Sequence, residues 1–169
     1  MPFSAEYDVV VVGGGHAGIE AAHAAYRLGV KTALLTMSIE AIGRMSCNPA
    51  VGGVAKGQIV RDIDALGGLM GKLTDKAGIQ FRMLNKSKGP AVWGPRAQCD
   101  MDFYSKCARE TLESFSGLDL LEGELASFSP FLQKTEILLA DGRKFLTKAL
   151  IITSGTFLAS KMYTGLLES

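Results

Sequence analysis

The sequence predicts an α/β fold, namely a Rossmann-like domain with a parallel sheet and a small β-meander. The main observation is an apolar run over residues 9–12 that leads directly into a glycine-rich turn. A helical stretch over 17–28 follows the turn, and a second apolar run occupies 33–35. A strand, a turn, a helix and a strand in this order form a βαβ unit, which we place at residues 6–36.

The glycine-rich turn reads Gly13-Gly14-Gly15-His16-Ala17-Gly18 and follows the G-x-G-x-x-G pattern. In that pattern the first glycine permits the sharp turn, the second lets the backbone approach a pyrophosphate, and the third lets the helix pack closely on the strand. The free N–H groups at the helix start then face the phosphates. We therefore predict a site for a dinucleotide, FAD or NAD(P), at this turn. The alternative is a βαβ unit whose glycine-rich turn is incidental.

One expected element of a dinucleotide site is missing from the second strand. That strand usually ends in an acid that binds the adenosine ribose, but here the first acid after it is Glu40. Either a hydroxyl of Thr36 or Ser38 contacts the ribose, or Glu40 reaches back to it. His16 lies at the helix start, where only a bound phosphate would favour its charged form. A direct contact between His16 and the cofactor is one possibility, and a histidine without a role in binding is the other.

Two irregular, glycine-containing stretches, 41–57 and 85–96, are predicted to be functional loops, because long loops within a compact domain usually serve a function. Between them, apolar residues recur at helical spacing over 59–73, and Gly67-Gly68 is expected to end or bend that helix. A further amphipathic helix is predicted over 101–115, ending near residue 117.

Strand patterns dominate from residue 118 onward. Residues 118–121 are expected to form a third parallel strand, and 135–146 a hairpin whose Asp141-Gly142 pair suits a type I′ turn. Residues 150–153 are predicted to be a buried strand. Because no helix follows to cover that strand, we expect residues 1–169 to be the N-terminal segment of a dinucleotide-binding domain in a larger enzyme. A complete minimal domain is the alternative.

The composition fits a protein of the cytoplasm. No apolar run approaches the roughly 18 residues that a membrane span requires, and residues 1–8 lack the pattern of a secretory signal. The net charge of +1 says nothing about partners. Cys47, Cys99 and Cys107 have neither metal-ligand spacing nor an even count, which favours a reducing compartment and no metal site.

Cys47 lies in the first predicted loop, close to Arg44 in the sequence. A thiol near a basic group can have a lowered pKa and act as a nucleophile, so Cys47 is a candidate catalytic residue. The alternative is an inert buried cysteine. Cys99 and Cys107 are assigned to the helix after the second loop, as packing residues.

A basic segment runs from residue 76 to residue 99, where no acid occurs. It contains Trp93 and Phe81, so it could hold a phosphate backbone and stack a base. The alternatives are a solvated loop and a patch that neutralises the cofactor's own pyrophosphate. Together with one lysine of the first loop, four of its basic residues are candidate contacts to a substrate: Lys56, Arg82, Lys86, Lys88 and Arg96.

Several segments closely resemble the MnmG family, also called GidA. The likeness covers almost the whole chain, and the two loops with Cys-Asn-Pro and Asn-x-Ser-Lys-Gly-Pro are specific to it. The segments are 13–18, 45–57, 64–70, 78–92, 95–98 and 155–158.

The resemblance implies an enzyme that modifies tRNA with FAD as its cofactor. With the GTPase MnmE, this family adds a carboxymethylaminomethyl or aminomethyl group to C5 of the wobble uridine 34. NADH and methylene-tetrahydrofolate are implied as co-substrates and a homodimer as the assembly, while the family's inserted and C-terminal domains are absent from this chain. A small-molecule FAD-dependent oxidoreductase, a folate- and FAD-dependent tRNA uridine methyltransferase and a non-catalytic dinucleotide-binding module are the alternatives.

The resemblance also implies roles for individual residues. Residues 13–18 would bind the FAD pyrophosphate, the backbone of Leu125 would contact FAD, and Cys47 would take part in the chemistry. The two loops, 41–57 and 85–96, would line the flavin and the tRNA entry.

Overall fold

The computed structural model describes residues 3–45, 48–156, 163–164 and 167–168, and its centre is a six-stranded sheet. Four neighbouring strands of this sheet run parallel, and the last two continue it as an antiparallel meander. In spatial order the strands are β6 (Leu118–Glu122), β2 (Thr32–Thr36), β1 (Ala5–Val12), β9 (Lys144–Ile152), β8 (Lys134–Leu139) and β7 (Leu125–Phe131). The predicted Rossmann-like α/β class with a small meander is confirmed.

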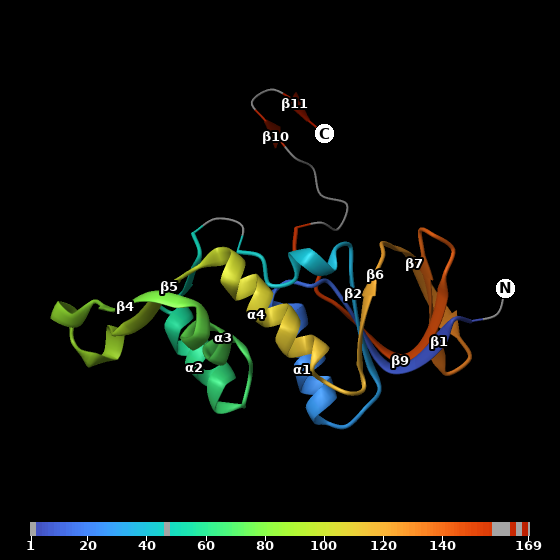
Figure 1. The fold of residues 1–169 in the computed structure, drawn as a ribbon, viewed down its shortest axis with the longest axis horizontal. Helices are drawn as coiled ribbons and strands as arrows, with labels where there is room; N and C mark the ends of the chain where they lie inside the picture. Colours follow the sequence, from blue (N-terminus) through green and yellow to red (C-terminus); the bar gives the residue numbers. More distant parts are fainter. Residues whose placement is uncertain (1–2, 46–47, 157–162, 165–166, 169) are drawn as a thin grey trace.

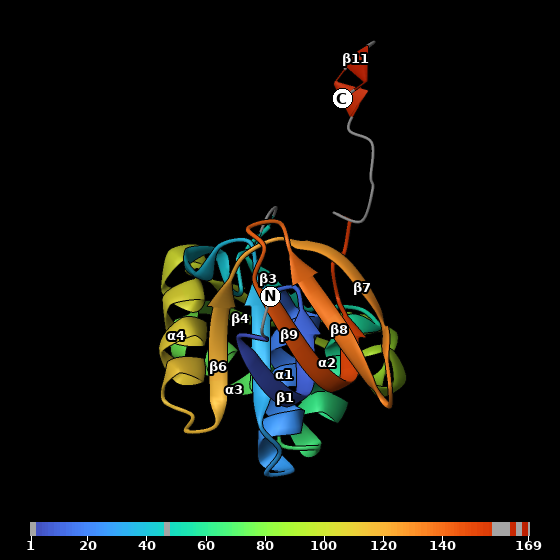
Figure 2. The same ribbon diagram turned by 90° about the vertical axis from the view of Figure 1, so that its right-hand side faces the viewer.

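Side chains that alternate along β1 separate two hydrophobic clusters, because successive residues of a strand point to opposite faces of the sheet. Val11 packs in a cluster with residues of α1 (His16–Arg27) and α4 (Met101–Glu113), which cover one face. Val10 packs in a second cluster with Ile137 and Phe145 of the meander. Figure 2 shows the meander strands β7 and β8 on the other side of β1 from α4. The parallel strands are therefore covered on both faces.

A second, smaller sheet forms a small lobe beside the parallel sheet (Figure 1). Its antiparallel strand order is β3 (Ala50–Gly52), β5 (Gly94–Cys99) and β4 (Gly78–Leu84). Two short helices, α2 (Lys56–Ala65) and α3 (Met70–Ala77), pack against it. We call residues 50–99 the small lobe.

The small lobe corrects the prediction that 41–57 and 85–96 are wholly irregular. The first stretch contains β3 and the start of α2, and the second contains the beginning of β5. The other regular structure in or beside the described parts of these stretches is limited to short 3₁₀ turns: η1 (Ile39–Ala41), η2 (Lys86–Lys88) and η3 (Pro90–Val92). Their glycines and prolines resemble loop residues locally, but the strands form because β3 and β5 pair with each other across a long sequence separation.

The remaining helix predictions are confirmed, except for one residue. A helix ends before Gly67, whose φ is +83°, and a new one begins at Met70. Cys99 does not belong to a helix: it ends β5, and α4 begins after Asp100, whose side chain accepts a hydrogen bond from the Phe103 N–H at 2.9 Å. This N-cap fixes the boundary between strand and helix.

The predicted third parallel strand is β6, and the predicted hairpin is β8–β9. The turn type was wrong: type I′ requires positive φ at both central residues, whereas Gly142 (φ +89°) has it and Asp141 does not. Residues 150–152 continue β9 and are not fully buried, since Ile151 and Ile152 are 38% and 40% exposed. Further along, β10 (Tyr163–Thr164) and β11 (Leu167–Glu168) pair antiparallel.

Candidate functional site

The glycine turn, residues 13–18, joins the carboxyl end of β1 to the start of α1 with very close backbone packing. Gly13 has φ +111°, and a Cβ there would lie 2.5 Å from the Thr153 carbonyl oxygen. A Cβ on Gly18 would lie only 1.8 Å from the Gly13 carbonyl oxygen. Both positions exclude any other residue, because real Cβ atoms do not approach backbone atoms so closely. Helix α1 therefore begins directly on top of the turn.

Gly15 differs from these two glycines because it faces open space. A Cβ built there would meet no atom within 4 Å, and its φ of −75° is ordinary. Gly15 is the N-cap of α1, and the first turn of the helix carries no acid. The first N–H groups of a helix have no intrahelical partner and attract anions. The opening beside Gly15 therefore fits the diphosphate of a dinucleotide.

His16 stands at the start of α1, in surroundings that favour the neutral form of its imidazole. Its ring lies edge-on to Tyr104, with centroids 5.6 Å apart, and its Nδ1 atom has no hydrogen-bond partner among the described residues. Burial lowers the pKa of His16, although the Glu20 carboxylate opposes this. The positive end of the helix dipole also disfavours the charged ring. An orphaned polar atom at this place fits a ligand that supplies the missing hydrogen bond.

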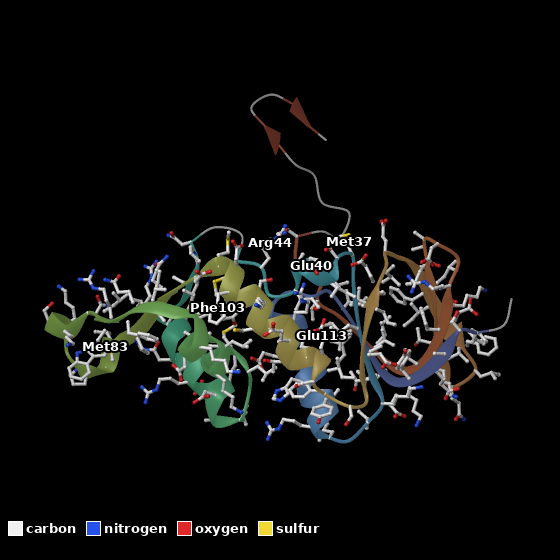
Figure 3. The ribbon with its side chains drawn as sticks, in the orientation of Figure 1. Met37, Glu40, Arg44, Met83, Phe103 and Glu113 are labelled. Carbon is white, nitrogen blue, oxygen red and sulfur yellow. The ribbon has the colours of Figure 1, made fainter. Side chains whose placement is uncertain are left out.

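Two of the three residues predicted to contact the ribose already have partners. The Thr36 hydroxyl donates to the Ser38 carbonyl oxygen at 3.2 Å, and Glu40 forms an ion pair with Arg109. Figure 3 shows Met37, Glu40 and Arg44 along one edge of the molecule. An acid that the sequence reasoning missed, Glu122, ends the neighbouring strand β6 and accepts the Ile39 N–H at 2.9 Å. The sequence signal for Glu122 is its place directly after the predicted parallel strand 118–121.

Leu125 lies at the same sheet edge as the glycine turn. The Gly123 N–H donates to the Thr36 carbonyl oxygen at the end of β2, at 2.9 Å, and the Gly13 N–H donates to the Leu35 carbonyl oxygen, at 2.8 Å. Leu125 follows two residues after Gly123 and begins β7. The fold therefore brings together two predicted cofactor contacts that are far apart in the sequence.

The predicted basic contacts all lie in the small lobe rather than at the glycine turn. Lys56 begins α2, Lys86 and Lys88 lie in η2, and Arg82 and Arg96 are direct partners across β4 and β5. The exposed Trp93 indole donates to the Lys86 carbonyl oxygen at 3.3 Å.

The cysteines divide into two groups. Cys99 and Cys107 are buried in the core beside α4, as predicted for packing residues, and burial raises the pKa of Cys99. Cys47 lies outside the described residues, so its catalytic role stays a prediction. Among the residues that the structure describes, no three His, Cys, Asp or Glu side chains are grouped closely enough to hold a metal ion. Nor does the described part contain a helix with the length and apolarity to cross a membrane.

A comparison with protein families decides the relationship. Residues 8–169 match the family model described as glucose inhibited division protein A. The chain belongs to this family. Two curated members are the tRNA uridine 5-carboxymethylaminomethyl modification enzymes MnmG of Chloroflexus aurantiacus and Salinibacter ruber. They are 51% and 50% identical to this chain over 94% and 95% of its length, respectively. The chain spans about a quarter of the length of these relatives, 25% and 24%.

Solved structures agree with the family assignment. Aquifex aeolicus GidA matches with a TM-score of 0.91 and 48% identity, covering 96% of this chain and 27% of that protein. A GidA-related protein from Thermus thermophilus has a TM-score of 0.64 at 17% identity, over 96% of this chain and 59% of that protein. The second likeness shows the fold alone.

Proposed function

We propose that this chain carries the dinucleotide site of an FAD-dependent enzyme that adds a carboxymethylaminomethyl group to C5 of the tRNA wobble uridine. The observation that carries the proposal is the glycine turn, closed at Gly13 and Gly18 but open at Gly15. It is supported by the names of the relatives, which state this modification. A small-molecule oxidoreductase would share the turn but would have no salt-dependent affinity for tRNA.

The role of these residues is to hold and orient the cofactor. Backbone N–H groups at the start of α1 bind the diphosphate, and Gly15 leaves room for it. Neutral His16 supplies a hydrogen bond through its unpartnered Nδ1, and the backbone at Leu125 contacts the nucleotide from the neighbouring strand end. FAD, when bound, supplies the redox chemistry that prepares the carbon unit for uridine C5.

The remaining components of the reaction come from the resemblance to the family. We infer that NADH and methylene-tetrahydrofolate serve as co-substrates, with the GTPase MnmE as the partner and a homodimer as the assembly. The residues held responsible for substrate contact are the basic ones of the small lobe: Lys56, Arg82, Lys86, Lys88 and Arg96.

Two measurements test the proposed function. The intact protein should purify yellow with bound FAD, and tRNA from cells that lack it should lose the modified wobble uridine. Reintroducing the wild-type gene should restore the nucleoside. An unchanged nucleoside composition in the deletion strain would reject the proposal, even if the protein binds FAD.

A further inference from the structure

The pairing of β4 with β5 gathers four polar side chains on one face of the small sheet. Gln80 lies directly opposite Gln98, and Arg82 lies directly opposite Arg96. Side chains of paired residues point to the same face, and the next pair along the strands points to the opposite one. Phe81 and its partner Ala97 therefore occupy the other face, where Ala97 is 5% exposed and belongs to the hydrophobic core.

The helices of the small lobe pack on the apolar face at β5, whereas Phe81 on β4 stays 59% exposed. Both α2 and α3 contact β5, from the side of the core residue Ala97. Figure 3 shows nitrogen-bearing side chains above the β4–β5 ribbon, on the side away from α2 and α3. We call Gln80, Arg82, Arg96 and Gln98 the polar sheet face.

The polar sheet face has no partner within the part of the chain that the structure describes. Within the described residues none of its four side chains forms a hydrogen bond or an ion pair, although both arginines line a groove that also contains Asp64 and Asp75. Side chains directly opposite in an antiparallel pair lie about 5 Å apart at Cβ, and like charges there are destabilising. Two facing guanidinium groups therefore weaken the isolated sheet, and an anion between them would remove that repulsion.

The polar sheet face lies on the same side of the molecule as the proposed cofactor site. In Figure 1 the parallel strand β6 points upward, and β4 and β5 lie above α2 and α3. The Gly43 N–H donates to the Gly14 carbonyl oxygen at 2.9 Å, and the chain reaches β3 only a few residues later. That length of chain limits the separation of the turn from β3 to about 30 Å.

We propose that the polar sheet face binds the RNA substrate: Arg82 and Arg96 hold adjacent backbone phosphates, and Gln80 and Gln98 hydrogen-bond to base edges. This inference rests on the proposed function. The planar guanidinium group matches a phosphate in two hydrogen bonds, which makes arginine the usual residue for this contact. A carboxamide offers two donors and one acceptor, which suits the unpaired edges of single-stranded bases.

The test measures the affinity of the intact, FAD-loaded protein for its tRNA at several salt concentrations. Each arginine that contacts a phosphate contributes about 0.7 to 0.9 to the slope of log K against log salt. Arg82→Gln and Arg96→Gln should each lower the slope by that amount and weaken binding about five- to eightfold at 0.1 M salt. Gln80→Ala and Gln98→Ala should weaken binding without changing the slope, because a carboxamide releases no counterion.

Lys72→Gln is the matched control, because Lys72 is an exposed basic residue of α3 in the same lobe. It does not line the groove of about 400 Å³ that Arg61, Arg82 and Arg96 share with Asp64 and Asp75. Its substitution should leave the affinity and the slope unchanged. Without RNA, Arg82→Gln should melt no lower than the wild type, since it relieves a like-charge contact, whereas a purely structural role would lower the melting temperature.

The outcomes separate the two proposals. If the wild type binds no tRNA, the proposed function fails and this inference fails with it. If the wild type binds tRNA with a normal salt dependence but Arg82→Gln and Arg96→Gln bind equally well, the inference alone is overturned. Loss of FAD from either arginine variant would also overturn it, because the face would then serve the cofactor rather than the RNA.

Discussion

The glycine turn and the polar sheet face build their surfaces in opposite ways. At the turn, side chains are absent: Gly13 and Gly18 let backbone atoms touch, and Gly15 leaves the helix start open. On the small sheet the backbone is ordinary, and the surface is made by side chains such as Arg82 and Arg96 that the strand register aligns. Gly13 and Gly18 therefore tolerate no added side chain, whereas a side-chain site can lose one contact and keep the fold.

Helix α1 holds the two regions together. The Glu20 carboxylate accepts hydrogen bonds from the Leu69 and Met70 N–H groups, at 2.9 and 2.6 Å, and so caps the start of α3. Arg27, two turns further along α1, donates to the Leu66 carbonyl oxygen. The helix whose start faces the proposed cofactor therefore also anchors the small lobe.

The largest effect is expected from Gly18→Ala. The added Cβ would lie 1.8 Å from the Gly13 carbonyl oxygen, and backbone on both sides leaves no flexible group to yield. We expect the free energy of unfolding to fall by about 3 kcal/mol or more, together with loss of FAD. Urea unfolding and the flavin absorbance of the purified protein measure the two effects.

Gly15→Ala separates the ligand from the fold at the same turn. Its Cβ meets no protein atom within 4 Å, so the stability should change by only about 1 kcal/mol, while the affinity for FAD falls. If Gly15→Ala binds FAD as tightly as the wild type, the diphosphate does not lie beside Gly15. If Gly18→Ala is as stable as the wild type, α1 does not pack on the turn as described.

An effect smaller than that of Gly18→Ala is expected from Glu20→Ala, which breaks the connection between the two regions. Two N–H groups at the start of α3 would lose a charged acceptor, which should cost about 2 kcal/mol in urea unfolding. Glu20→Gln keeps one acceptor oxygen and should cost about half as much. Hydrogen exchange should show the loss as faster exchange in the small lobe, with the parallel sheet unchanged.

Glu113→Ala is the matched control for that substitution. Glu113 is also a helical glutamate, but it is exposed and faces Arg109 at 3.8 Å. An exposed ion pair of this kind contributes about 0.5 kcal/mol or less. Equal losses for Glu20→Ala and Glu113→Ala would show that the capping bonds contribute nothing beyond an ordinary surface charge.

The sequence predicted the dinucleotide half well because its signals are local. Residues 6–36 contain the strand, the glycine turn, the helix and the next strand in order, and each boundary fell within a few residues of its prediction. Gly18 is required by its close contact with the Gly13 carbonyl oxygen in the same turn. Gly13 is required by its contact with Thr153, which lies beside the turn in space. The hairpin after residue 134 was found for the same reason, although a left-handed conformation at Gly142 alone gives a different turn from the one predicted.

The small lobe was missed because its strands are specified by distant partners. Residues 78–84 carry no buried alternation, since Phe81 is 59% exposed, and β3 is a short strand whose partner β5 lies across both helices. The basic residues there were recognised by composition, but composition cannot show that Arg82 faces Arg96. The register of the strands was needed for that, and it also added Gln80 and Gln98.

The last expected effect is a dependence of stability on pH that arises from the two histidines of the dinucleotide half. Both histidines of the chain, His16 and His23, lie on α1. Burial lowers the pKa of each; for His23, Arg27 also lowers it and Glu20 opposes the shift. Below a pH of about 6.5 the unfolded chain therefore binds protons that the folded chain resists. The stability is fully present above that pH and is lost as the pH falls.

Urea unfolding of the intact apoprotein between pH 7 and 5.5 measures this loss, which is limited to about 1.4 kcal/mol per pH unit for each proton. His23→Phe removes one titrating group but keeps a ring to stack on Phe115, whose centroid lies 5.3 Å from that of His23. This variant should lose the part of the pH-dependent stability change that His23 contributes. The pH dependence that remains should come from His16. A wild-type stability that is constant over this range would contradict the burial of both rings, because an exposed imidazole would titrate alike in the folded and unfolded chains.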